Sequence, residues 1–227
     1  YKKLLNIFRK SINLVFVLSK IKSQTYQRSL AIKKAKNELI LQIDDDVIIF
    51  PNAINYMQKY FDNIDKKIIV GGYLIYPNNE HVSKRFTKYY KSSSLLKLIY
   101  FGLNLFKKPN QMSILKSGRI FPLMEDSNKN KEWLSSFLMY TKKTYYLSDV
   151  HFNLGKGYYE DIIFTHKLYK LGYELVMEKK SKVKIDYNIS TGITSYYKSL
   201  PMQYYFVKSF KKNIFLFIIE IFIFSFI

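Results

Sequence analysis

The sequence of 227 residues contains no cysteine and only four arginines. The lack of cysteine excludes a disulfide scaffold, a Cys-ligated zinc or iron–sulfur site, and thiol catalysis. We also expect no signal peptide, because the first residues lead into an amphipathic stretch rather than a long apolar one. The chain begins at Tyr1 without an initiator Met, so we expect residues upstream of it.

Basic residues greatly outnumber acidic ones, with 37 Lys and Arg against 17 Asp and Glu and a net charge of +20. Arginine makes the bidentate contacts to phosphate and guanine that favour nucleic-acid binding, yet almost all of these cations are lysines. We therefore expect no nucleic-acid partner. Scattered lysines together with 21 Tyr and 18 Phe suit an anionic membrane surface better.

The C-terminal residues 214–227, IFLFIIEIFIFSFI, are apolar apart from Glu220 and Ser225. This segment is shorter than the about 20 residues that a membrane-spanning helix needs. Lysines just before it would keep the preceding domain on the cytoplasmic side. These lysines are Lys208, Lys211 and Lys212. We expect one domain over residues 1–200 and a membrane-associating segment over 201–227, at the cytoplasmic face of the membrane. The alternative is a C-terminal core helix or an interfacial helix.

Helical and strand patterns alternate along the chain, which predicts an α/β fold built in layers. The expected helices are residues 26–36, 51–61, 93–106 and 159–171, the last closed by Gly172. The expected strands are residues 39–43, 68–70, 133–140 and 174–177, of which the first is buried and the second is ended by Gly71 and Gly72.

A cluster of three acidic residues, Asp44, Asp45 and Asp46, follows the first of these strands. The ends of such strands commonly present ligand-binding groups in α/β sheets. Oxygen-only ligands favour Mg²⁺ or Mn²⁺. Alternation along an extended segment would send Asp44 and Asp46 to one side, where both could share one metal–diphosphate group. The alternative is an acidic turn or helix cap before Pro51.

A second acidic pair, Glu160 and Asp161, opens the predicted helix 159–171 after a Gly-rich, aromatic lead-in. The N-terminus of a helix carries a partial positive charge, which keeps a nearby carboxylate ionised and able to accept a proton. Helix capping alone would also explain one of the two residues.

The order of these elements resembles family-2 glycosyltransferases of the GT-A fold. The resemblance rests on QRSLAIKKAKNELILQIDDDVIIFPNAI (27–54), KEWLSSFLMYTKK (131–143) and YYEDIIFTHKLYKLGYELVMEKKSKV (158–183). It implies a GT-A-like α/β fold, in which helices flank a mixed sheet, with a C-terminal apolar helix here. It also implies an inverting transfer from a nucleotide-sugar donor to a hydroxyl of a cell-surface polysaccharide or lipid-linked glycan acceptor.

The resemblance also assigns roles on the donor side. It implies that Asp44, Asp45 and Arg28 contact the nucleotide-sugar. Asp46 and Asp44 would hold Mg²⁺ or Mn²⁺ on the diphosphate. Many family members place a His after the last strand, where this chain has Asp186, an oxygen ligand that could replace it.

On the acceptor side, the resemblance implies that Trp133 lines the site. Asp161 would be the base that takes the proton from the acceptor hydroxyl, with Glu160 in support. The family usually has Gly after the Trp-Leu pair, where Ser135 and Ser136 stand here. That difference could narrow the acceptor site.

The family's first strand should lie well upstream of Asp44, so we expect the N-terminal nucleotide-binding part to be incomplete. Nucleotidyl transfer to a sugar phosphate is disfavoured, because no Gly-rich basic loop occurs near the N-terminus. A catalytically inactive or truncated relative that binds a membrane surface is the other alternative.

Overall fold

The computed structural model describes residues 15–62, 66–76, 78, 80–110, 112–122, 131–135, 138–146, 159–185 and 193–225. The helices in these residues are α2 (Gln24–Lys34), α3 (Ala53–Gln58) with the 3-10 helix η1 (Lys59–Phe61), α4 (Val82–Ser92), α5 (Ser94–Leu103), α6 (Lys143–Tyr146), α7 (Glu160–Lys170), α8 (Ile193–Ser209) and α9 (Ile214–Ser225). The strands are β1 (Leu39–Ile43), β2 (Val47–Ile49), β3 (Ile68–Ile75), β4 (Ser113–Ile114), β5 (Ile120–Phe121), β6 (Leu138–Lys142) and β7 (Glu174–Ile185).

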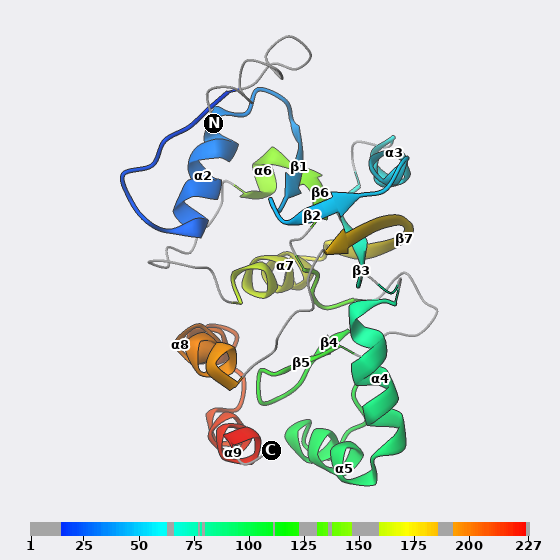
Figure 1. Cartoon of the computed structure of the whole chain (residues 1–227). Coiled ribbons are helices and arrows are strands. Elements are labelled where there is room, and N and C mark those ends of the chain that lie inside the picture. Colours follow the sequence, from blue (N-terminus) through cyan, green and yellow to red (C-terminus); the bar gives the residue numbers. More distant parts are fainter. Residues whose placement is uncertain are drawn as a thin grey trace.

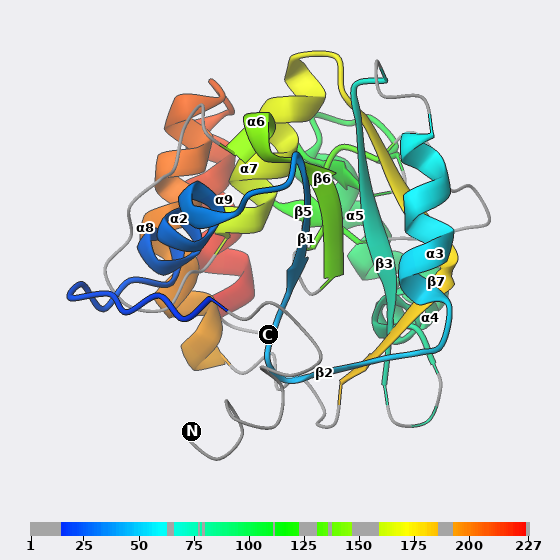
Figure 2. The ribbon, with the colours of Figure 1, turned by 90° about the horizontal axis from the view of Figure 1, so that it is seen from above.

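Five of the strands form a mixed sheet in the order β1-β6-β3-β7-β2. Strands β3 and β7 are parallel, and the other neighbours are antiparallel. Val70 of β3 pairs with Tyr140 on one side and Val176 on the other, so β3 lies at the centre. Strands β1 and β2 are consecutive in the chain but lie at opposite edges of the sheet (Figure 2).

Helices cover both faces of this sheet, because successive side chains of a strand point to opposite sides. On one face Ile68 and Val70 pack with Met57 of α3. On the other face Ile69 packs with Ile163 of α7. Figure 1 shows α3 and α7 on the two sides of the strands. The predicted α/β fold with a mixed sheet between helices is confirmed.

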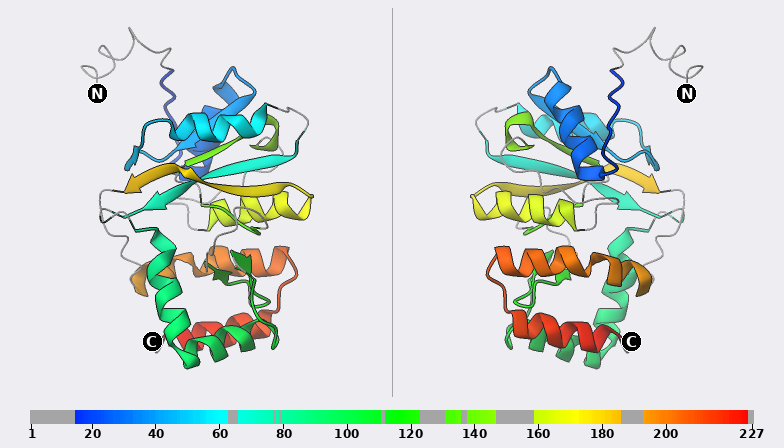
Figure 3. Two further views of the ribbon diagram at one scale, coloured as in Figure 1. Left: turned by 90° about the vertical axis from the view of Figure 1, so that its right-hand side faces the viewer. Right: turned by 90° about the vertical axis from the view of Figure 1, so that its left-hand side faces the viewer.

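A second body of structure lies beyond α7, on the side away from the sheet. It consists of α8, the hairpin of β4 and β5, and helices α4, α5 and α9 (Figure 3). Its own core is a cluster of buried side chains from α5 and the hairpin, namely Tyr100, Leu103, Leu115 and Phe121.

Most predicted elements are present, but several differ in burial or length. The strand predicted over residues 133–140 is β6, Leu138–Lys142, and residues 133–135 are not in a strand. The strand predicted over residues 174–177 continues to Ile185 as β7. Strand β3 continues through Gly71 and Gly72, which were expected to end it. A Cβ on Gly72 would lie 2.9 Å from the side chains of both Leu138 and Val183, so glycine here permits close packing. Strand β1 was expected to be buried but is partly exposed, since it pairs only with β6 among the described residues.

Helices α4 and α8 were not predicted from the sequence. Helix α8 continues across residue 200, where we had placed a boundary between the domain and the C-terminal segment. Phe206 and Val207, in the C-terminal half of α8, are fully or almost fully buried. That half of α8 therefore belongs to the folded core. The predicted C-terminal apolar helix is confirmed as α9.

A buried ion pair ties α9 to the hairpin. The carboxylate of Glu220, which has no exposed side-chain surface, accepts a hydrogen bond of 3.0 Å from Nη1 of Arg119. The Arg119 guanidinium also donates to the hydroxyl of Tyr100 at 3.3 Å and lies 3.6 Å from the ring centre of Phe224. Burial raises the pKa of Glu220, although Arg119 opposes that shift. The single acidic residue of α9 thus has a structural partner.

We predict that Glu220→Gln lowers the free energy of unfolding by about 3 kcal/mol, because it leaves the Arg119 charge buried without its partner. Urea denaturation measures this change. The double variant Glu220→Leu with Arg119→Met should recover much of the loss. As a control, Glu80→Gln removes an exposed pair with Lys84 and should change stability little. Equal effects of the two single variants would contradict the prediction.

Candidate functional site

Arg28 joins two of the predicted motifs. It lies on α2, a helix capped by the side chain of Ser23, which accepts a hydrogen bond from the backbone N–H of Tyr26. Its Nη2 donates to Oδ1 of Asp44 at 2.7 Å, and its Nη1 donates to Oε1 of Glu160 at 2.9 Å. These partners lie 16 and 132 residues away in the sequence. One guanidinium therefore brings the end of β1 to the start of α7.

The carboxylates around Arg28 carry more negative charge than it can neutralise. Burial is the main cause that raises the pKa of Asp44, while Arg28 lowers it. The charges of Asp46 and Glu160 raise it further. Among the described residues, Arg28 is the only cation that lowers the pKa of Asp44, whereas the charges of two carboxylates raise it. This place is therefore favourable for an additional positive charge.

Asp45 and Asp46 lie in the turn between β1 and β2, and both are exposed. The predicted alternation of the three acids does not apply, because it holds for an extended segment and these residues form a turn. The charge of Asp46 nevertheless acts on Asp44. The acids therefore form the acidic turn that was the alternative expectation, and Asp44 and Asp46, the two proposed metal ligands, are close enough for their charges to interact.

Asp161 is connected to the Trp-Leu segment through Thr165. The hydroxyl of Thr165 donates to the backbone oxygen of Asp161 at 2.8 Å and accepts from the backbone N–H of Leu134 at 3.1 Å. One Asp161 carboxylate oxygen accepts from the N–H of Ile162 at 2.8 Å. A second contact joins His166 Nδ1 to the backbone oxygen of Glu132 at 3.0 Å. Helix α7 therefore positions residues 132–134 beside the Glu-Asp motif.

Tyr159 fixes the start of α7, a role that the sequence analysis missed. Its backbone is in the left-handed region, with φ of 69°, a conformation that bulky residues rarely adopt. Its hydroxyl donates to the backbone oxygen of Gly118 at 2.8 Å, and its ring packs edge-on against Phe206. Its pKa is raised by burial. The signal available in the sequence was the aromatic pair directly before Glu160.

Trp133 is 8% exposed and packs in the core cluster that includes Leu134 and Ile162. Its Nε1 is buried and has no hydrogen-bond partner among the described residues. The structure places Trp133 in the same core cluster as Ile162 of α7. Its proposed contact with an acceptor remains a prediction.

Asp186 lies outside the described residues. Its neighbour Ile185 pairs with Val47, the residue that follows Asp46. Among the described residues, no group of three His, Asp or Glu side chains is placed to hold a metal ion. A Mg²⁺ ion at this turn would therefore need further ligands, such as substrate phosphates, which commonly supply them.

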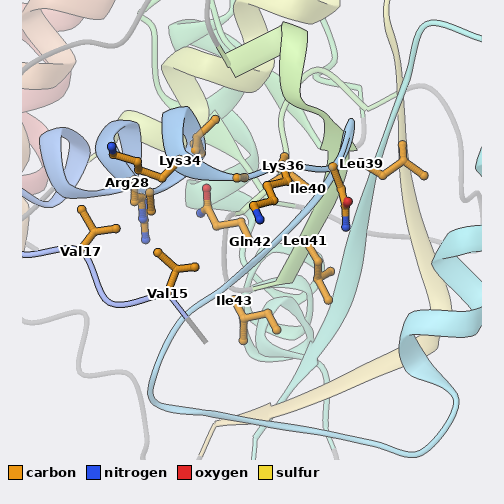
Figure 4. Close-up of a pocket in the computed structure, with 14 residues that line it drawn as sticks. Val15, Val17, Arg28, Lys34, Lys36, Leu39, Ile40, Leu41, Gln42 and Ile43 are labelled. Carbon is orange, nitrogen blue, oxygen red and sulfur yellow. The ribbon is translucent and has the colours of Figure 1, made fainter. Parts of the chain in front are cut away.

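A cavity of about 650 Å³ lies between α2, β1 and residues 15–17. Figure 4 shows Val15, Val17 and Ile43 around it, with Arg28 and Gln42 adding polar groups. The wall is mainly aliphatic, and Arg28 borders both the cavity and the carboxylate cluster. The cavity volume is within the usual range for ligand pockets, about 300–1,000 Å³.

Comparison with solved structures identifies the fold as that of a GT-A glycosyltransferase. The chain is similar to GalNAc-T7, solved with UDP, GalNAc and Mn²⁺, with a TM-score of 0.56 and 11% sequence identity. The match covers 83% of this chain and 34% of that one, so the chain spans about a third of its length.

The sequence model of Glycosyl transferase family 2 matches residues 5–122, just over half of the chain. The chain therefore belongs to glycosyl transferase family 2, as the resemblance predicted. The matched region contains Arg28 and the Asp44–Asp46 turn and ends before Trp133 and the Glu-Asp motif. No curated protein sequence matches the chain significantly.

We predict that Arg28→Met lowers the free energy of unfolding by about 1–2 kcal/mol, because Asp44 and Glu160 lose their shared donor. Arg28→Lys should recover only part of this loss, since an ammonium group lacks the fork that reaches both carboxylates. Urea denaturation measures both changes. Lys33→Met, an exposed substitution on the same helix, is the control. A similar loss in this control would count against the bridge.

Proposed function

We propose that this protein transfers a sugar from a nucleotide-sugar donor to a hydroxyl group of a glycan acceptor, with inversion at the anomeric carbon. The observation that carries the proposal is the double ion pair of Arg28, which joins the acidic turn after β1 to the first turn of α7. Family membership and the GT-A fold support the same reaction class.

The donor would bind along β1. Its nucleoside would occupy the cavity beside Arg28, and its diphosphate would lie toward the Asp44–Asp46 turn, with Arg28 and Asp45 as further contacts. The excess of carboxylates at this turn is unfavourable without a counter-charge. The oxygen ligands there suit Mg²⁺ or Mn²⁺.

Asp46 and Asp44 would hold this ion, with Asp186 as a further ligand. The pairing of Val47 with Ile185 supports the inclusion of Asp186. When bound, the ion neutralises charge on the departing nucleoside diphosphate.

Asp161 would act as the base. Its carboxylate takes the proton from the acceptor hydroxyl, whose oxygen forms the new bond to the anomeric carbon as the bond to the diphosphate oxygen breaks. The bonding electrons leave with the nucleoside diphosphate. Glu160, held by Arg28, would position Asp161 and the acceptor, and Trp133 would line the acceptor side.

A cell-surface polysaccharide or lipid-linked glycan, handled at the cytoplasmic face of a membrane, is the proposed acceptor. The net charge of +20 and the apolar helix α9 support a location at a membrane surface. Release of the nucleoside diphosphate distinguishes an active transferase from a catalytically inactive relative.

We predict that one nucleoside diphosphate stabilises the protein against thermal unfolding in a Mn²⁺-dependent way. A ligand at about 100 times its Kd adds about 2.7 kcal/mol to the stability. The measurement compares UDP, dTDP and GDP, each with and without Mn²⁺. Asp46→Ala should abolish the shift, whereas Asp62→Ala, an exposed acid at the end of η1, should preserve it. A shift that survives Asp46→Ala would reject the assigned metal ligand.

We predict that Asp161→Asn lowers kcat by about 10²–10⁴-fold, because an amide cannot accept the acceptor's proton. Binding of the nucleoside diphosphate should remain unchanged. Release of the diphosphate from a panel of nucleotide-sugars, with and without glycan acceptors, measures the rate. Normal nucleotide binding with no release by the unmodified protein would favour the inactive relative.

A further inference from the structure

Two helices that are far apart in the sequence lie side by side at the end of the molecule. Helices α5 and α9 both border the second body of structure on its outer side, farthest from the sheet (Figure 3). The rings of Tyr100 on α5 and Phe224 on α9 pack edge-on, with their centres 6.3 Å apart. The two helices therefore form one continuous outer layer.

Each of these helices exposes a stripe of large apolar side chains. On α5 the stripe is Leu95, Leu98 and Phe101, which are 63%, 65% and 38% exposed. On α9 it is Phe215, Ile218 and Phe222, which are 70%, 45% and 62% exposed. Residues three or four apart lie on one face of a helix. Six apolar residues are thus presented on two adjacent helix faces.

The two stripes point away from the protein core. The opposite face of α5 carries Tyr100 and Leu103, which are buried in the core cluster of the hairpin. The opposite face of α9 carries Glu220, paired with Arg119 of the hairpin, and Phe224, which packs against the same cluster. Because both helices turn their buried faces to one cluster, their exposed stripes lie on the same outer surface.

The turn after α5 extends this surface at an energetic cost. Leu105 and Phe106 both have left-handed backbones, with φ of 53° and 58°, which are uncommon for bulky residues. The turn leaves Phe106 72% exposed, with its ring packed edge-on against Phe101. The turn therefore adds a further exposed aromatic side chain to the apolar surface of α5.

The rim of this surface is positively charged. Lys97 on α5, Lys107 and Lys108 after it, and Lys211 before α9 are all exposed. The stretches 94–108 and 211–225 contain one acidic residue, Glu220, and it is buried and paired. Apolar side chains surrounded by lysines match the acyl region and the headgroups of an anionic bilayer.

We infer that the exposed face of α5 and α9 docks on an anionic lipid bilayer, with both helices lying in the plane of the membrane. None of the described helices is long and apolar enough to cross a membrane. Helix α9 would measure about 18 Å, against about 30 Å for the hydrocarbon core. A second copy of the chain is a poorer occupant, because two equally positive rims would repel each other.

This inference is independent of glycosyl transfer, so its test uses neither nucleotide nor acceptor. The 227-residue chain is sedimented with phosphatidylcholine vesicles that contain or lack phosphatidylglycerol. We expect binding to the anionic vesicles that weakens as salt is added. Leu98→Glu and Phe222→Glu should each lower the binding constant about tenfold or more. Leu171→Glu, at a 57% exposed leucine after α7, is the matched control and should not lower it.

The charge contribution is tested separately. The double variant Lys107→Glu with Lys108→Glu should lower binding to anionic vesicles about tenfold or more. The same change at another exposed lysine pair, Lys66 and Lys67 before β3, should have a much smaller effect. Thermal unfolding verifies that each variant folds. Phe106→Ser removes one exposed aromatic ring without adding a negative charge. It should weaken vesicle binding, but less than the substitutions by Glu.

Three results would overturn the inference. One is the absence of binding to anionic vesicles by the unmodified chain. Another is an equal loss in Leu171→Glu and Leu98→Glu. The third is self-association of the unmodified chain without vesicles that Leu98→Glu and Phe222→Glu abolish, which would make this face a contact between copies.

Discussion

The double ion pair of Arg28 is the interaction on which the arrangement of the candidate site depends. Asp44 directly follows β1, a strand at one edge of the sheet, and Glu160 begins a helix that packs on one face of the sheet. Without a shared cation, these carboxylates would repel each other in a partly buried place. The guanidinium suits this role because its planar fork reaches two carboxylates at once. The position of Asp161, next to Glu160, follows from the same constraint.

Helix α7 connects the sheet to the rest of the molecule. One side of it packs on β3 through residues such as Ile163. Thr165 and His166 hold the segment before β6, while Tyr159 reaches the hairpin through Gly118. One helix carries all of these contacts, and Glu160 at its start is further joined to Asp44 through Arg28. Such preorganisation is what general-base chemistry requires.

Strand and helix periods predicted the fold class and many elements correctly, including β1 and α7. The local sequence pattern gave wrong element bounds where contacts between distant parts of the chain determine the structure. A pair of glycines usually indicates a turn, but Gly72 lies within β3. Glycine is required there because the side chains of Leu138 and Val183 occupy the space that a Cβ would need. The resemblance assigned Arg28 and Asp44 to the donor side and Glu160 to the acceptor side. The sequence alone could not predict that Arg28 links both acids, since that depends on how α2 and α7 pack.

The contact of Glu220 with Arg119 also determines how the C-terminal end of the chain can be shortened. In the sequence, α9 resembles a separate C-terminal segment. In the structure it provides Glu220, the counter-ion of the Arg119 guanidinium, which also contacts Tyr100 and Phe224. A shortened version that ends before α9 would remove both Glu220 and Phe224, and would uncover the buried cluster of Tyr100, Leu103, Leu115 and Phe121 against which α9 packs. Fragments designed for expression or crystallisation should therefore retain α9, and solubility should be sought through its outer face.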